Sequence, residues 1–109
     1  MTIIFTEKTP LPWLQPVSLK RSTWADHILV SHPEMTGNLE KIKSVVRAPT
    51  RVVTGSSGDD RYIFIDDRET KGKRQAVLIA VVDVLTAEIV TAPYRVDYTG
   101  SRKGDKVWP

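Results

Sequence analysis

The sequence predicts an α+β domain, with two N-terminal helices packed on one face of a roughly four-stranded antiparallel sheet. Two observations support this class. Apolar residues recur at helical spacing between residues 23 and 47, and afterwards the period falls to about two, as in strands. Several short apolar runs then follow one another between polar turns, as in an antiparallel meander. Helices gathered on one side of such a sheet form an α+β architecture.

Residues 1–21 are predicted to form an N-terminal arm, because three prolines exclude a helix there. A short edge strand at residues 3–5 is the most that this arm is expected to contain. The 109 residues are the size of one ordinary domain. We place a single α+β domain at residues 22–98 and a polar C-terminal tail at residues 99–109.

The first helix is predicted over residues 24–31. Thr23 and Asp26 have the spacing of a capping box, which indicates the helix start. Pro33 should end the helix, because the residue before a proline is pushed out of the α region. The second helix is predicted over LEKIKSVVR, residues 39–47, where apolar side chains form a stripe. Asn38 is its expected N-cap, and a proline follows its end.

Four strand candidates follow the helices. They are RVVT (51–54), RYIFID (61–66), QAVLIAVVDVL (75–85) and EIVTA (88–92). The third is the longest apolar run and is expected to be a central strand buried on both faces. GSSGDD and DRETKGKR are turns by composition, and YRVDYT is expected to continue the sheet as an edge.

Composition excludes several classes of protein. The chain has no cysteine, so a disulfide framework and a thiolate metal site are excluded. No apolar run approaches the roughly 20 residues of a membrane span, and the N-terminus is not a secretory signal, so a cytoplasmic location is expected. Glycine-rich nucleotide loops and the G-x-S-x-G elbow are missing. The net charge of +3 favours an anionic partner slightly.

Both histidines lie in the stretch WADHILVSHPEM, residues 24–35. Two imidazoles, each able to titrate near neutral pH, can act as general base and general acid. On an ideal helix His27 and His32 would lie roughly 140° apart and would not share a face. His32 precedes a proline, however, so its backbone is expected to leave the helix, which would let it point back toward the sheet. Hydrogen-bonded structural histidines are the alternative interpretation.

Arginine and hydroxyl side chains on the predicted strands are candidates for binding a phosphate. Arg51 and Arg61 open neighbouring strands, and a guanidinium can pair bidentately with a phosphate and stabilise charge that develops on it. Thr91 and Tyr94 could donate hydroxyl hydrogen bonds to the same anion. Lys73, in a basic turn, is a further substrate-binding candidate. Surface charge and β propensity explain the same residues without a function.

Residues 24–35 have the pattern W-x-x-H-I-L-x-x-H-P-E-M. They are followed by an amphipathic helix, a proline, a strand, R-Y-I-F, a long apolar strand and I-V-T-A. This arrangement resembles the phage-type members of the barnase–EndoU–colicin–RelE nuclease superfamily. The resemblance spans about residues 22–94, and its histidine-containing part is the most specific. Arg61 with Tyr62 matches an Arg-aromatic pair at a strand start. The resemblance implies a small, metal-independent ribonuclease, of a kind found as toxins and in phage and mobile-element proteins.

The reaction that this resemblance implies is attack of a ribose 2′-hydroxyl on the adjacent phosphate, which leaves a cyclic phosphate and a free 5′-hydroxyl. One of His27 and His32 would be the base and the other the acid. Arg61 would stabilise the phosphorane, and Thr91 would orient a phosphate oxygen. Pro93, two residues after Thr91, departs from the pattern.

The expected partner is therefore RNA, with no cofactor and no metal ion. A cognate antitoxin or immunity protein and a homodimer are further partners that the sequence leaves open. The alternative function is a non-catalytic module on the same fold, which binds nucleic acid or a protein.

Overall fold

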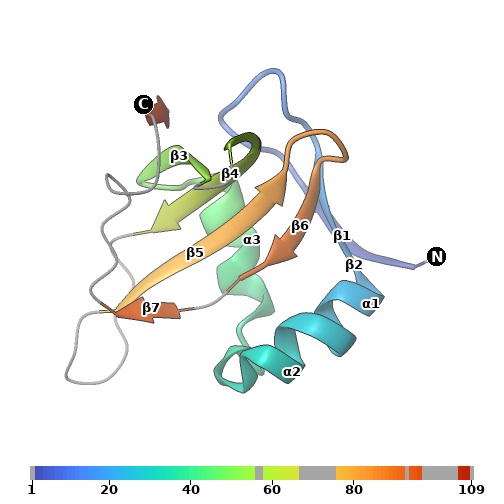
Figure 1. Cartoon of the computed structure of the whole chain (residues 1–109). Coiled ribbons are helices and arrows are strands. Elements are labelled where there is room, and N and C mark those ends of the chain that lie inside the picture. The colour runs from blue at the N-terminus through green and yellow to red at the C-terminus, as the bar shows by residue number, and fades with distance from the viewer. Residues whose placement is uncertain (1, 56–57, 67–75, 93, 97–105, 109) are drawn as a thin grey trace.

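The structure is a computed structural model that describes residues 2–55, 58–66, 76–92, 94–96 and 106–108 (Figure 1). Two strands come first in the chain, then the helical segments, then the remaining strands. The elements are β1 (Ile3–Glu7), β2 (Val17–Lys20), α1 (Arg21–Thr23), a π-helical turn (Trp24–Ile28), α2 (Leu29–Ser31), a 3₁₀ turn (Pro33–Met35), α3 (Leu39–Arg47), β3 (Arg51–Gly55), β4 (Gly58–Asp66), β5 (Ala76–Asp83), β6 (Glu88–Thr91), β7 (Tyr94–Val96) and β8 (Lys106–Trp108).

The strands form one sheet in the order β1-β2-β6-β5-β4-β3-β8, and β7 also pairs with β5. The predicted α+β class is confirmed, but the predicted number of four strands is wrong. The prediction of two helices at the N-terminal end of the fold is also wrong, since β1 and β2 precede them. The sheet is antiparallel apart from the contact of β2 with β6, which is parallel.

The segment predicted as an arm supplies both β1 and β2. Its three prolines fall in the connection between these strands, residues 8–16, where they remove no hydrogen bond from the ladder. β1 pairs antiparallel with β2, and β2 contacts β6 where Ser18 lies opposite Glu88. The N-terminal segment therefore extends the sheet rather than lying beside it.

The first helical segment begins at Arg21, earlier than predicted. Thr23 has helical backbone angles and makes no capping hydrogen bond, so the predicted capping box is wrong. β2 runs directly into the helix through Lys20, whose backbone is extended. The backbone N–H of Arg21 donates to the carbonyl of Thr2 at 2.9 Å, so the residue before β1 supplies the partner that a capping side chain would otherwise provide.

The predicted helix ends are confirmed. The first segment stops at Ser31, and His32 leaves the α region with φ −136° and ψ 71°, as expected before Pro33. The second helix, α3, spans the predicted residues 39–47 and packs against β4 and β5. Asn38 precedes it but makes no side-chain capping bond.

Apolar side chains pack on both faces of the sheet. On the helix-covered face, Phe64, Leu78 and Ala80 belong to one cluster with the buried side chains of α3. On the other face a second cluster contains Val53, Ile63, Ile65, Val77 and Ile79. Because successive strand residues point to opposite faces, β5 contributes to both clusters. This confirms its prediction as a central strand buried on both sides.

The C-terminal tail, which is predicted only as polar, contains β8. Trp108 lies opposite Val52 of β3, and it is packed against the cluster on the helix-covered face. The predicted turn DRETKGKR lies almost wholly outside the described residues. Among the helices that are described, none is long and apolar enough to cross a membrane.

Candidate functional site

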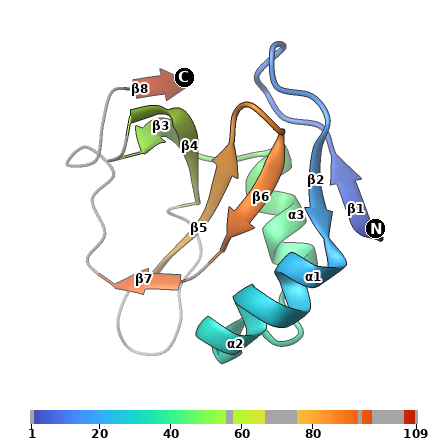
Figure 2. The same cartoon turned by 45° about the vertical axis from the view of Figure 1, so that its right-hand side comes forward.

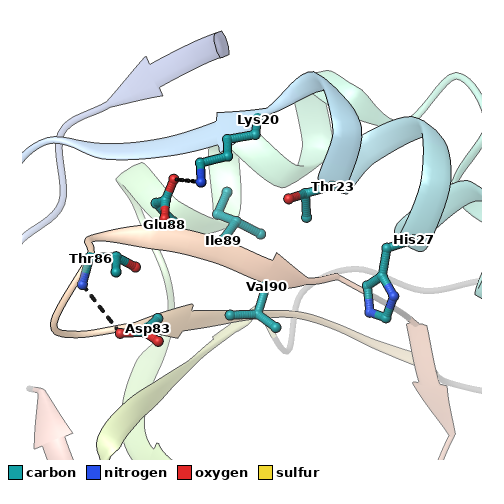
Figure 3. A pocket seen from close by; sticks show the side chains of 8 residues that line it. All are labelled: Lys20, Thr23, His27, Asp83, Thr86, Glu88, Ile89 and Val90. Carbon is teal, nitrogen blue, oxygen red and sulfur yellow. Dashed lines mark hydrogen bonds and ion pairs between the residues drawn. The ribbon is translucent and has the colours of Figure 1, made fainter. Parts of the chain in front are cut away.

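A surface hollow of about 350 Å³ lies where β2, β6 and the end of β5 meet the first helical segment (Figure 3). Its wall combines charged groups, hydroxyls and two apolar β6 side chains. The lining residues are Lys20, Thr23, His27, Asp83, Thr86, Glu88, Ile89 and Val90. Residues 20–27 and 83–90 are distant in the sequence, and the contact between β2 and β6 brings them together.

The β5–β6 turn is held in place by hydrogen bonds of Asp83. Its Oδ1 atom accepts the backbone N–H groups of Leu85 at 2.9 Å and Thr86 at 3.2 Å. The carbonyl of Asp83 accepts the N–H of Ala87, which has a φ of 55° in the left-handed region. Ala87 in turn accepts the N–H of Ser18 from β2 at 2.9 Å. These bonds fix the position at which the chain enters β6.

His27 projects from the π-helical turn. The N–H of Leu29 donates to the carbonyl of Trp24, five residues back, which identifies this turn as wider than an α-helical one. Such turns are rare and often lie at functional sites. Ile28 is fully buried and anchors the turn to the core, whereas the neighbouring His27 is exposed. Within the described part of the chain, the imidazole makes no hydrogen bond or ion pair.

The fixed charges of the hollow are two carboxylates and one ammonium group. Lys20 Nζ lies 2.9 Å from Glu88 Oε2, and both side chains are about one quarter exposed. Asp83 adds the second carboxylate, and Thr23 and Thr86 supply hydroxyls (Figure 3). The arrangement places an imidazole and carboxylates around one space, which is the set that general acid–base chemistry uses. Among the described residues, no group of three or more metal-ligating side chains is found.

Of the four predicted catalytic residues, His27 lines the hollow and the other three do not. His32 lies after the helix end, and its Nδ1 atom is 3.6 Å from Oε2 of Glu34. The hydroxyl of Thr91 is buried, with no hydrogen-bond partner in the described part of the chain. Arg61 is exposed and lies opposite Asp83 in the β4–β5 pairing. Directly opposed residues share a face of the sheet, so Arg61 lies beside the hollow.

Of the predicted substrate-binding residues, Arg51 and Tyr62 have described side chains, and neither lines the hollow. Arg51 begins β3, opposite Ile65 of β4, and Tyr62 accepts a hydrogen bond from Trp13 Nε1 at 3.2 Å. Tyr94 begins β7, but its side chain is not described. Lys73 lies outside the described residues.

Sequence reasoning missed five charged or hydroxyl residues of the hollow, which are Lys20, Thr23, Asp83, Thr86 and Glu88. Their roles depend on the pairing of β2 with β6, which no local pattern indicates. The segment DVLTAE carried one usable signal, because an Asp that starts a tight turn commonly binds backbone N–H groups. Comparison of the chain with protein-family models, curated proteins and solved structures found no match.

Proposed function

We propose that this protein is a metal-independent, toxin-like RNA endonuclease and that the hollow around His27 is its reaction centre. The observation that carries the proposal is the exposed imidazole at a hollow that also contains carboxylates, hydroxyls and a lysine. The guanidinium of Arg61, on the strand position opposite Asp83, adds a cation beside the hollow. The resemblance of the histidine motif to the barnase–EndoU–colicin–RelE superfamily supports the same reaction class.

In the proposed reaction, a base removes the proton of a ribose 2′-hydroxyl and the resulting oxygen attacks the adjacent phosphorus. The bond to the 5′-oxygen breaks, and an acid gives that oxygen a proton. We assign one proton transfer to His27 and the other to the carboxylate of Glu88, which Lys20 holds at 2.9 Å. Arg61 would stabilise the negative charge of the phosphorane. His32 receives no role, because it does not line the hollow.

The test is cleavage of a labelled RNA oligonucleotide in the presence of a chelator, with detection of a 2′,3′-cyclic phosphate end. His27→Asn should reduce the rate by roughly 100-fold or more, as expected for loss of a general acid or base. His32→Asn is the matched control and should retain activity, since both histidines lie in the same helical motif. The proposal fails if the purified protein leaves RNA intact, or if both variants cleave as fast as the parent.

The charge of the hollow favours a second candidate, a non-catalytic binding module. Asp83 and Glu88 outnumber Lys20, so the fixed charge would repel a polyanion while His27 is neutral. Such a module would bind a polar or cationic ligand or a protein. In the same assay it would leave RNA intact, and any RNA binding that it showed would be unaffected by His27→Asn and would weaken steeply with salt.

A further inference from the structure

The connection between β1 and β2 is a rigid loop that displays one aromatic side chain. Leu11 and Leu14 are buried in the core and anchor it. The hydroxyl of buried Thr9 lies within hydrogen-bond distance of the N–H of Leu11 and the carbonyl of Leu14. The side-chain amide of Gln15 donates back to the carbonyl of Thr9 at 2.9 Å. These contacts fix the backbone on either side of position 13.

Trp13 stands out from this loop with 60% of its surface exposed. Its Nε1–H group donates to the hydroxyl of Tyr62 at 3.2 Å. The indole has no other polar group, so this hydrogen bond orients the ring and uses its donor. An incoming ligand therefore meets an oriented π surface. Bases of single-stranded nucleic acid stack on such surfaces whatever their sequence, because every base has a π face.

The loop lies at the same end of the molecule as the β5–β6 turn (Figures 1 and 2). This turn contributes Thr86 to the hollow. Tyr62, the partner of Trp13, follows Arg61 directly in β4 and lies opposite Val82, the neighbour of Asp83, so its side chain points to the opposite face of the sheet from Arg61. A strand of RNA held at the hollow and at Arg61 would thus reach Trp13 by passing around this end of the sheet.

We propose that Trp13, oriented by Tyr62, is a stacking platform for an unpaired base of single-stranded RNA bound across the hollow. This inference rests on the proposed function, since it extends the same binding site. Loss of one stacked base should weaken binding roughly tenfold to hundredfold. Hydrogen bonds to base edges play no part, so the preference for base sequence should be weak.

The experiment measures binding of a 2′-O-methyl oligonucleotide, which lacks the attacking hydroxyl and cannot be cleaved by the proposed reaction. Fluorescence anisotropy of a labelled oligonucleotide gives the dissociation constant. Trp13→Leu should weaken binding roughly tenfold to hundredfold, and Trp13→Phe should retain most of the affinity of the parent. Val30→Ser is the matched control, because Val30 is 71% exposed on α2 at the opposite end of the molecule. An oligonucleotide with abasic positions should bind the parent and Trp13→Leu equally, since it lacks the bases that would stack on Trp13.

The inference is overturned if the oligonucleotide does not bind, if Trp13→Leu binds as tightly as the parent, or if Trp13→Leu weakens binding of the abasic oligonucleotide equally. These outcomes are distinct from failure of the proposed reaction. If RNA is cleaved with dependence on His27 but binding is independent of Trp13, only the stacking platform is refuted. If binding depends on Trp13 but RNA stays intact, the nuclease proposal is refuted and the platform remains.

Discussion

Replacing Thr9 by valine tests whether the loop that carries Trp13 is built as described. Thr9 is 6% exposed, and valine has nearly the same shape without the hydroxyl. The single hydroxyl proton can be donated to the carbonyl of Leu14 at 2.9 Å, and the oxygen accepts the N–H of Leu11 at 3.0 Å. In the variant both backbone groups lose a partner inside buried residues. Each such loss costs about 1 kcal/mol or more, so we expect a loss of about 2 kcal/mol in the free energy of unfolding.

Urea unfolding followed by circular dichroism measures this loss, which corresponds to a melting temperature lower by roughly 8 °C for a domain of this size. Thr6→Val is the matched control. Thr6 is exposed on β1 and makes no side-chain hydrogen bond within the described residues. The free energy of unfolding of Thr6→Val should therefore differ from that of the parent by less than about 0.5 kcal/mol. If Thr9→Val were as stable as the parent, the buried hydroxyl would not hold the loop, and the orientation of Trp13 would need another cause.

Two further substitutions test the turn and the core. Ala87→Gly should raise the free energy of unfolding by up to about 1 kcal/mol, because Ala87 has a φ of 55° and glycine adopts this region without strain. Ala25→Gly, in the helical segment, should instead lower the free energy of unfolding by about 1 kcal/mol. Equal effects of the two substitutions in urea unfolding would refute the reasoning. Phe64→Ala should lower the free energy of unfolding by about 3–5 kcal/mol, because Phe64 is fully buried between the sheet and α3. A loss of less than about 1 kcal/mol, measured by calorimetry, would contradict this packing.

Local patterns predicted the elements that depend on local interactions. The stripe of apolar residues and the following proline marked α3 at its observed ends. The alternation in RYIFID and the long apolar run marked β4 and β5, and two-sided burial was also expected for β5. The sequence also indicated that His32 would leave the helix, because the steric effect of a proline on the preceding residue acts within two residues.

Pairing between distant segments could not be predicted in this way. β8 pairs with β3, and β2 contacts β6, yet neither contact has a periodic signal in the sequence. Because of the prolines between β1 and β2, the sequence predicts no more than a short edge strand at residues 3–5, although the prolines affect only the connection and β2 follows it. The prediction of a capping box was wrong for a related reason, because Thr2, the residue before β1, supplies the partner of the first helical N–H group.

The two histidines show that unpredicted pairing between distant segments also affects the candidate site. Their residue type and the family resemblance indicated a pair that shares acid and base roles, but of the two only His27 lines the hollow. The other residues that line the hollow include Lys20 and Glu88, whose ion pair exists only because β2 meets β6. A carboxylate can take the role first given to His32, since proton transfer requires a base within reach and does not require a second imidazole. The proposed chemistry therefore keeps its reaction class while one of its two proton-transfer groups changes, and comparing His27→Asn with His32→Asn decides between the two assignments.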